Sequence, residues 1–374
     1  MKILLLIPSV LKTQTDEAVA ADRHPKMDYY ALADRLEALG DQVDLYDYAA
    51  LDADTNTLVK SARKAGRDAG MAMAGFVRRA AYDAVFTNGE NLAIPLALLF
   101  KTVSRRPWHV TIGHRLSTGK KRLFFTSIKA HQQIDRIFLY AQTQYDFARQ
   151  TLGVPGAALR LIPFHADDRF YRPLSNIPVI ENQISSAGLE WRDYPTLIEA
   201  VSTMPDLSVK LAASSPWSKH QNETENRTLP PNVDARRYEY GDLRTLYGQS
   251  QFVVVPLYEN DFQAGVTTIL EAMAMGKAVI ATRTTGQTDV LIDGETGLYV
   301  APGDVAGWRE AITRLREDDA LRSRLAQAGR RWLEDNATLD RWADGIAGAL
   351  HDGAAAQSQS EGALAGASHR TETN

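Results

Sequence analysis

The chain has 374 residues with 44% apolar and 24% charged side chains, an ordinary composition for a soluble protein of about two domains. It contains no cysteine, which excludes disulfides, thiol nucleophiles and cysteine-based zinc sites. The apolar run at the N-terminus breaks at Pro8, and no stretch approaches the ~20 apolar residues that a spanning helix needs. We therefore expect a cytoplasmic protein that begins with a buried strand.

Strands and helices alternate through the first half of the chain. An amphipathic helix is predicted over Met27–Leu39, where apolar residues recur at helical spacing. Short β-branched runs predict strands at Lys2–Pro8, Gln42–Tyr46, Ala84–Thr87, Trp108–Ile112, Arg136–Ala141 and Leu159–Pro163. Such runs, separated by helices, predict a parallel sheet covered on both faces.

Positive charge is concentrated in residues 57–130, which hold 14 basic and three acidic residues although the whole chain has a net charge of −4. Two interpretations stay open, an anionic partner and a solvated arginine-rich surface. For the first, we expect a helix over Leu58–Tyr82 that lies on an anionic membrane surface. Its basic residues are Lys60, Arg63, Lys64, Arg67, Arg78 and Arg79.

A second alternation follows a proline-containing break between Arg172 and Pro178. It predicts strands at Val179–Ser186, Ser208–Ala213, Phe252–Pro256 and Ala278–Thr282, and helices at Pro195–Ser202, Thr267–Met275, Val305–Asp318 and Asp319–Asn336. The fold class is therefore α/β, with two doubly wound domains over residues 1–173 and 178–335. Ligands of such sheets bind at the carboxyl ends of the strands. Residues 351–374 are poor in large apolar side chains, so a disordered tail is predicted there.

The segment from Pro256 to Thr282 carries the clearest chemical signal. Gly265 lets the backbone approach a ligand closely, and Thr267 or Thr268 can cap the helix that follows. The amino end of this helix is a seat for a diphosphate. Glu271 lies one turn further on, where a carboxylate can bind ribose hydroxyls. From the residues alone, this predicts an anion-binding cleft.

Residues 252–304 resemble the donor-binding core of the group 1 retaining glycosyltransferases (glycosyltransferase family 4), which have the GT-B fold. The resemblance rests on LEAMAMGKAVIAT, on the turn Thr285–Asp289 and on DGETGLYVAPGD. It implies that Glu271 holds the donor ribose and that Gly265, Val266, Thr267 and Thr268 line the diphosphate site. It also implies that residues 336–350 form a helix that crosses back to the first domain.

One position departs from the family pattern, in which a first glutamate precedes Glu271 by eight residues. Gln263 stands there and is the residue expected to contact the donor sugar. A neutral amide can bind sugar hydroxyls but supplies no charge. Either the subgroup tolerates glutamine, which we expect, or Glu259 or Asp261 substitutes for the missing carboxylate.

Two further residues are assigned through the resemblance. Arg192, in SAGLEWRDYPTLIEA, matches a basic position that grips donor phosphates; the alternative is a surface ion pair with Asp193 or Glu190. His114, at the end of HVTIGHRL, matches a strand-end histidine near the reaction centre. Asn88 and Glu90, which follow the preceding strand, are further candidates for facing the acceptor.

The implied activity is transfer of a hexosyl group, with retention, from a nucleoside-diphosphate sugar to a hydroxyl acceptor on a lipid or polysaccharide precursor. We expect UDP as the nucleotide, no metal or other cofactor, no nucleic-acid partner, and a cytoplasmic enzyme peripheral to the inner face of the membrane. The open alternatives are a sugar phosphorylase, a nucleotide-sugar epimerase, and a non-catalytic nucleotide-sugar-binding protein.

Overall fold

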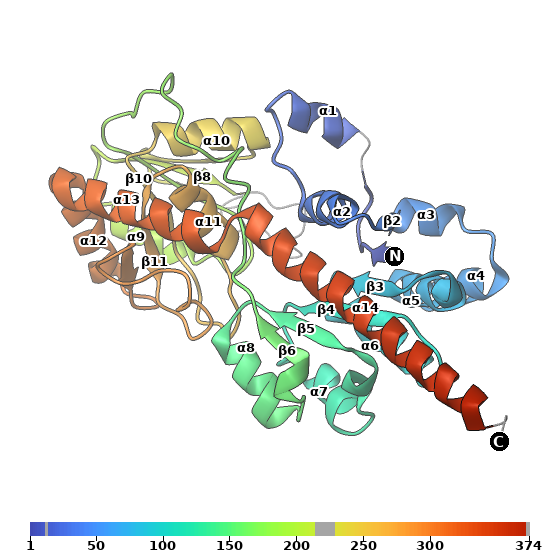
Figure 1. The fold of residues 1–374 in the computed structure, drawn as a ribbon. Coiled ribbons are helices and arrows are strands. Elements are labelled where there is room, and N and C mark those ends of the chain that lie inside the picture. Colours follow the sequence, from blue (N-terminus) through green and yellow to red (C-terminus); the bar gives the residue numbers. More distant parts are fainter. Residues whose placement is uncertain (12–13, 214–228, 372–374) are drawn as a thin grey trace. The chain divides into compact units, whose positions relative to one another are not determined.

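The computed structural model describes residues 1–11, 14–213 and 229–371, and these fold into two compact units (Figure 1). Unit 1 contains the described residues of Met1–Thr13, Met27–Ile162 and Ala343–Asn374. Unit 2 contains Gln14–Lys26 and the described residues of Pro163–Trp342. The main division after Ile162 lies before the proline-containing break that the sequence indicates.

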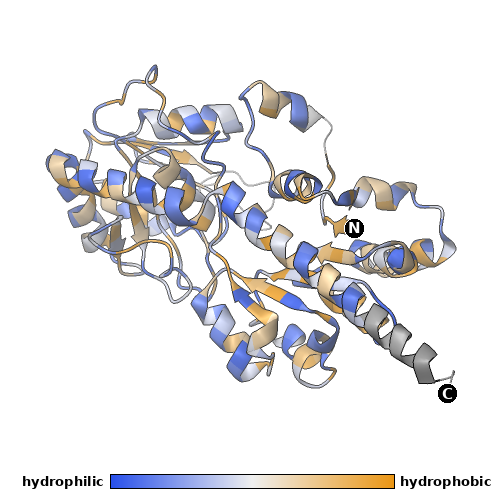
Figure 2. Ribbon diagram, viewed as in Figure 1, coloured by the Kyte–Doolittle hydropathy of each residue, from blue (hydrophilic) through white to orange (hydrophobic). Residues whose placement is uncertain are grey.

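Unit 1 is built on a six-stranded parallel sheet with strand order β2-β1-β3-β4-β5-β6. The strands are β1 (Lys2–Leu6), β2 (Gln42–Tyr46), β3 (Ala84–Thr87), β4 (Trp108–Gly113), β5 (Arg136–Leu139) and β6 (Leu159–Leu161). β1 and β3 are largely apolar because both faces of the sheet are covered, and Figure 2 shows orange strands in this sheet. The neighbouring strand β4 also buries two polar residues, His109 and Thr111. All six strands lie at the positions predicted from the sequence, with ends that differ by a few residues.

Helices connect these strands on both faces of the sheet. They are α2 (Asp28–Ala38), α3 (Tyr48–Ala53), α4 (Thr57–Arg63), α5 (Arg67–Arg78), α6 (Glu90–Phe100), α7 (Gly119–Thr126) and α8 (Gln142–Asp146), with 3₁₀ turns η1 (Arg79–Ala81), η2 (Ala130–Gln133) and η4 (Gly156–Ala158) and a π-helical turn η3 (Phe147–Thr151). The connections make every neighbouring strand pair parallel.

The single basic helix predicted over Leu58–Tyr82 is wrong. Gly66 adopts a φ of +139°, outside the helical region, and separates α4 from α5. The apolar face of α5, which includes Met71 and Ala74, is buried in the core of unit 1 and is not available to a bilayer. Part of the charge is also neutralised, since Arg63 and Arg67 pair with Asp52.

Unit 2 has a second six-stranded parallel sheet, with order β12-β11-β10-β7-β8-β9. Its strands are β7 (Gln183–Ala187), β8 (Ser208–Ala212), β9 (Val233–Arg236), β10 (Phe252–Val255), β11 (Ala278–Thr282) and β12 (Leu298–Val300). Its helices are α1 (Gln14–Ala20), α9 (Tyr194–Val201), α10 (Tyr240–Gln249), α11 (Val266–Ala274), α12 (Val305–Glu317) and α13 (Asp319–Asn336). The short strands β9 and β12 are not among the elements predicted from the sequence.

The last helix, α14 (Leu339–Thr371), corrects the prediction of a disordered tail from residue 351. From Ala343 onward, this helix belongs to unit 1. Its backbone comes so close to the Trp108 ring that a Cβ on Gly353 would lie 2.2 Å from it, and Ala354 is only 1% exposed. The Gln357 amide donates to the Arg106 carbonyl at 2.8 Å. Small residues therefore extend the helix here because they permit close packing.

The segment Gln14–Lys26 lies in unit 2 although the residues on both sides of it lie in unit 1. Asp22 holds the carboxyl-terminal part of this segment, because its carboxylate accepts hydrogen bonds from Arg172 and from Arg244. The backbone N–H of Lys26, the last residue of the segment, donates to Asp167 Oδ2 at 2.7 Å. Between them, the His24 ring packs edge-on against Tyr240, with ring centroids 4.3 Å apart. Unit 2 is thus completed by an N-terminal segment.

Candidate functional site

The topology of unit 2 places a candidate ligand site between β7 and β10. The chain runs from β7 outward to β8 and β9, then returns to pair β10 with the other side of β7. At such a switch point, the loops that leave the two neighbouring strands diverge and open a crevice at their carboxyl ends. The loop after β7 carries Arg192, and the loop after β10 leads to Gly265.

Gly265 shapes the turn into α11. Its φ of +78° is in the left-handed region, and an added Cβ would lie 2.8 Å from Val255 Cγ1. It occupies the N-cap position, where no side chain caps the helix. The first backbone N–H groups of α11, those of Val266, Thr267 and Thr268, therefore lie at the positive end of the helix dipole, as a diphosphate site requires.

Capping by Thr267 or Thr268, which the sequence allowed, is wrong. Thr267 is exposed, whereas the buried Thr268 hydroxyl donates to the Ala187 carbonyl and accepts a bond from Arg192 Nη2 at 3.1 Å. Thr268 therefore ties the first turn of α11 to the end of β7. Its hydroxyl therefore holds the first turn of α11 in place and does not act as the N-terminal cap of the helix.

Arg192 is buried beneath this turn and is only 7% exposed, which overturns the alternative of a surface ion pair. Its Nε donates to the Ala187 carbonyl at 2.8 Å, and its Nη1 donates to the Glu190 carbonyl at 2.8 Å. Burial lowers the pKa of the guanidinium from its usual value, although the nearby Glu271 acts in the opposite direction. The arginine thus brings a fixed positive charge to the floor of this candidate anion site.

Glu271 is buried one turn further along α11, with 7% of its surface exposed. The hydroxyl of Tyr247, on α10, donates to Glu271 Oε2 at 2.9 Å. Burial raises the pKa of Glu271 to about 7, and the Tyr247 hydrogen bond and the Arg192 charge oppose that rise. The carboxyl group is therefore held in one place, with a pKa raised towards neutrality.

Gln263 lies two residues before Gly265 and is half-buried. Its Nε2 donates to Asp289 Oδ2 at 3.4 Å, and its Oε1 is buried without a hydrogen-bond partner among the described residues. Of the acids considered as substitutes, Glu259 accepts the backbone N–H of Thr285 at 2.8 Å, so it holds a loop. The carboxylate that Gln263 contacts is Asp289, which the sequence marked only as the last residue of the matching turn.

In unit 1, His114 follows β4 and is exposed, with its ring 5.7 Å from that of Tyr140. Glu90 is buried, and its carboxylate accepts the backbone N–H groups of His114 and Arg115 at 2.9 and 3.2 Å. Burial raises the pKa of Glu90, but the charges of His114 and Lys121 outweigh this effect and leave it lowered. Glu90 therefore positions the His114 loop, and the prediction that it faces an acceptor is wrong.

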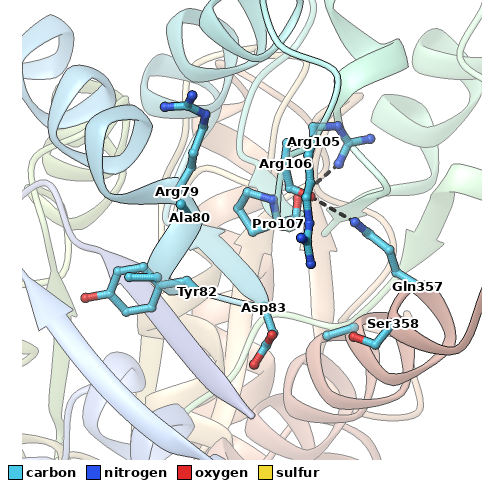
Figure 3. Close-up of a pocket in the computed structure, with 11 residues that line it drawn as sticks. Arg79, Ala80, Tyr82, Asp83, Arg105, Arg106, Pro107, Gln357 and Ser358 are labelled. Atoms are coloured by element: carbon cyan, nitrogen blue, oxygen red, sulfur yellow. Dashed lines mark hydrogen bonds between the residues drawn. The ribbon is translucent and has the colours of Figure 1, made fainter. Parts of the chain in front are cut away.

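A separate surface pocket of 290 Å³ lies in unit 1, at the edge of the sheet where the strands begin (Figure 3). Its walls come from the segments that precede β3 and β4 and from α14, including Arg79, Arg105, Asp83, Gln357 and Ser358. Since ligands of parallel sheets bind at the carboxyl edge, this pocket at the amino edge is not part of the site described above.

Residues 1–11, 14–213 and 229–371 contain neither a candidate metal site nor a candidate membrane span. No group of three or more histidine, aspartate or glutamate side chains in these ranges could hold a metal ion. No helix in the same ranges is both long and apolar enough to cross a bilayer.

Residues 186–332 match the family model described as "Glycosyl transferases group 1". The chain shares this segment with the group 1 glycosyl transferases. The segment contains Arg192, Gln263, Gly265 and Glu271, so the family match and the site coincide. The lipopolysaccharide core biosynthesis glycosyltransferase LpsE of Rhizobium meliloti (strain 1021) is 43% identical over 148 residues, which are 39% of this chain and 42% of the relative.

Other glycosyltransferases match over shorter stretches. The capsular polysaccharide biosynthesis glycosyltransferase CapM of Staphylococcus aureus is 32% identical over 108 residues, 29% of this chain and 27% of CapM. A D-inositol 3-phosphate glycosyltransferase of Salinispora arenicola (strain CNS-205) is 35% identical over 120 residues, 32% of this chain and 25% of the relative. The chain thus spans less than half of the length of each of these relatives.

Several solved structures share the fold over nearly the whole chain. Sucrose-phosphate synthase from Thermosynechococcus elongatus matches with a TM-score of 0.70 and 18% identity, covering 95% of this chain and 99% of that one. Anabaena HepE in complex with UDP and glucose matches with a TM-score of 0.64 and 16% identity, covering 94% and 99%. The GT-B fold class expected from the group 1 resemblance is confirmed.

Proposed function

We propose that the chain is a glycosyltransferase that transfers a sugar from a nucleoside-diphosphate sugar to a hydroxyl acceptor, with UDP as the nucleotide. The observation that carries the proposal is the convergence at one switch point of the α11 amino end, the buried Arg192 and the buried Glu271. The helix end and the guanidinium suit a diphosphate, and a carboxylate one turn away suits the ribose hydroxyls.

The comparisons support the same activity. The relatives that match the segment carry names of lipopolysaccharide core and capsular polysaccharide glycosyltransferases. HepE, which shares the fold, was solved with UDP-glucose and with UDP. We therefore propose a hydroxyl acceptor on a polysaccharide or lipid-linked saccharide precursor, and UDP-hexose as the donor class.

The mechanism that fits the site assigns its largest effect to stabilisation of the leaving diphosphate. Negative charge gathers on that group as the bond to the sugar breaks, and fixed donors aimed at it lower the barrier. We propose that the α11 N–H groups and Arg192 supply this stabilisation without a metal ion, that the sugar is transferred with retention, and that His114 positions donor or acceptor.

For the acceptor surface, we propose peripheral binding to anionic lipid by charge alone. Lys60 and Lys64 are exposed on and just after α4, while the apolar face of α5 is buried. Binding of this kind falls with ionic strength. Sedimentation with anionic vesicles should decrease steeply between low and high salt, and a K60A/K64A variant should sediment less. Equal binding to neutral vesicles would overturn this part of the proposal.

The central test is a thermal-shift series with UDP, GDP, ADP and TDP on the full chain. We expect UDP to stabilise the protein and E271A to remove that effect, while E317A, an exposed glutamate at the end of α12, retains it. Indifference of the wild-type protein to all four nucleotides would refute the donor site.

Incubation with UDP-sugars separates the activity from its alternatives. Release of UDP favours a transferase, and interconversion of the sugar without release of UDP favours an epimerase. Dependence on free phosphate favours a phosphorylase. Nucleotide binding with no turnover under any of these conditions favours a non-catalytic binding protein.

A further inference from the structure

The amide of Gln263 is oriented by its neighbour. An ionised carboxylate only accepts hydrogen bonds, so the NH₂ group of Gln263 must face Asp289, from which Nε2 lies 3.4 Å away at Oδ2. The other amide atom, Oε1, then points away from Asp289. It is buried and has no hydrogen-bond partner among the residues that the structure describes. A buried acceptor without a partner is unfavourable, so this atom is suited to receive a donor from a ligand.

The docking of two loops places these side chains together. Gly286 donates its backbone N–H to the Asn260 carbonyl at 2.9 Å, and a Cβ on Gly286 would lie 2.2 Å from the Phe262 backbone. The Thr285 N–H is bound by Glu259 at 2.8 Å. The loop after β11 is therefore fixed against the loop that leads to Gly265. The contact between Gln263 and Asp289 follows from this packing.

Gln263 precedes Gly265, the N-cap of α11, by two residues. In the function proposed above, a diphosphate binds at this helix end, which brings the group attached to its outer phosphate close to Gln263. In a sugar donor, that group is the sugar. Positive charge develops on its anomeric carbon as the bond to the diphosphate breaks. A negative charge held close to that carbon, in a site partly shielded from water, would lower the barrier.

We propose that Asp289 is a positioning residue that supplies the negative charge at the sugar end of the site through Gln263. The proposal rests on the function proposed above. Gln263 Oε1 accepts a hydrogen bond from a sugar hydroxyl, while Asp289 polarises and orients the amide from behind. A single carboxylate would provide both the hydrogen-bond acceptor and the negative charge. Here Gln263 provides the acceptor and Asp289 provides the charge.

The pair also selects the class of sugar. A neutral hexose offers hydroxyl donors to Gln263 and is not repelled by Asp289. A sugar that carries a carboxylate, such as a uronic acid, would place a second negative charge near Asp289. The donor class is therefore a neutral UDP-hexose, and discrimination against UDP-uronic acids depends on Asp289.

The test compares D289N, Q263E and the double variant Q263E/D289N in the full chain. For D289N, we expect UDP release from the best neutral UDP-hexose to slow at least tenfold, and the Kd of that donor to rise, while the Kd of UDP alone stays within twofold. Discrimination against UDP-glucuronate should weaken. D293N, which removes an acid of the same loop that pairs with Arg283, is the matched control and should leave all these values unchanged.

The glutamate variants supply a readout that a structural role would not move. Q263E puts two carboxylates side by side, so one carboxyl pKa rises and the rate gains a pH dependence. The double variant has one carboxylate and one amide with their positions exchanged, and it should be faster than either single variant.

Two outcomes overturn the proposal. One is a double variant that is not faster than both single variants, and the other is a D289N defect that appears equally in UDP affinity and in melting temperature. Failure of the wild-type protein to bind any nucleoside diphosphate would instead refute the proposed function itself.

Discussion

The hydroxyl of Tyr247 donates a 2.9 Å hydrogen bond to Glu271 Oε2, and both side chains are buried. Tyr247 lies on α10 and Glu271 on α11, so this bond joins two helices at the edge of the candidate site. It favours the ionised form of a carboxyl group that burial alone would keep protonated. The ionisation of Glu271 at neutral pH therefore depends on the Tyr247 hydroxyl, which the sequence pattern does not reveal.

Removal of this phenol should weaken nucleotide binding in a pH-dependent way. In Y247F, the pKa of Glu271 should rise further, because an opposing hydrogen bond is lost. We expect the Kd of UDP at pH 7 to increase roughly tenfold, the scale of one hydrogen bond to a charged group. Isothermal titration calorimetry at pH 6 to 9 should show the gap to wild type narrowing as pH rises; a gap independent of pH would contradict this role.

Stability should also depend on the ionisation of Glu271. Its pKa in the folded protein, about 7, lies above the ordinary value of 4.5. Between pH 4.5 and 7, the folded protein therefore keeps a proton on Glu271 that the unfolded chain has released. The stabilisation that this proton gives is fully present below pH 4.5 and is lost as the pH rises through 7. The decrease in the free energy of unfolding approaches about 3 kcal/mol at pH 8, because one pKa unit corresponds to about 1.36 kcal/mol.

The variant E271Q has no such proton to release. We expect its melting temperature, relative to that of wild type, to increase steadily from pH 5 to pH 8. Differential scanning calorimetry of both proteins without nucleotide checks this, and a constant difference across the range would show that Glu271 does not titrate there.

Gly265 should be sensitive to substitution for two separable reasons. G265A faces the cost of a positive φ, about 1–2 kcal/mol, and also a clash of the new Cβ with Val255. Gly294 provides the control, because its φ is +73° but no atom lies within 4 Å of an added Cβ. We expect G294A to be destabilised only by the cost of its positive φ and to bind UDP as the wild type does. G265A should be less stable than G294A and bind UDP at least tenfold more weakly; equal unfolding midpoints in urea would argue against the clash.

Shortening of α14 should destabilise unit 1. A protein ending at Leu350 loses the packing of Gly353 and Ala354 near Trp108 and the bond from Gln357 to Arg106. We expect its melting temperature to fall by about 3–8 °C, because 1 kcal/mol corresponds to roughly 2–4 °C in a unit of this size. A protein ending at Ser360 keeps these contacts and should melt like the full chain. Equal melting of all three proteins would show that the segment beyond Leu350 contributes nothing.

Much of the fold follows from local pattern. Buried strands such as β3 and β11 are short apolar runs between helices, so their bounds are predicted correctly. Gly265 and Glu271 lie within one segment, and a turn followed by a helix defines their relative positions. Arg192 required the family resemblance, since a lone arginine next to acidic residues also fits a surface ion pair.

The features that escaped prediction depend on contacts between distant residues. Asp289 contacts Gln263 only because two loops dock, and nothing in either loop alone indicates the pairing. The residues of α14 after Leu350 have a composition typical of disorder, and their order comes from Trp108, far away in sequence. The break at Gly66 was missed because the basic residues on both sides of it suit one continuous helix.

The placement of Gln14–Lys26 in unit 2 has a practical consequence for dissecting the protein. Neither unit is a continuous stretch of chain, so cleavage after Ile162 does not yield two intact halves. A fragment that begins at Pro163 lacks Asp22 and leaves the guanidinium of Arg244, 12% exposed in the intact chain, without that counter-charge. Such a fragment should regain stability when a peptide spanning residues 14–26 is added. The N-terminal segment thus serves unit 2 as a built-in ligand.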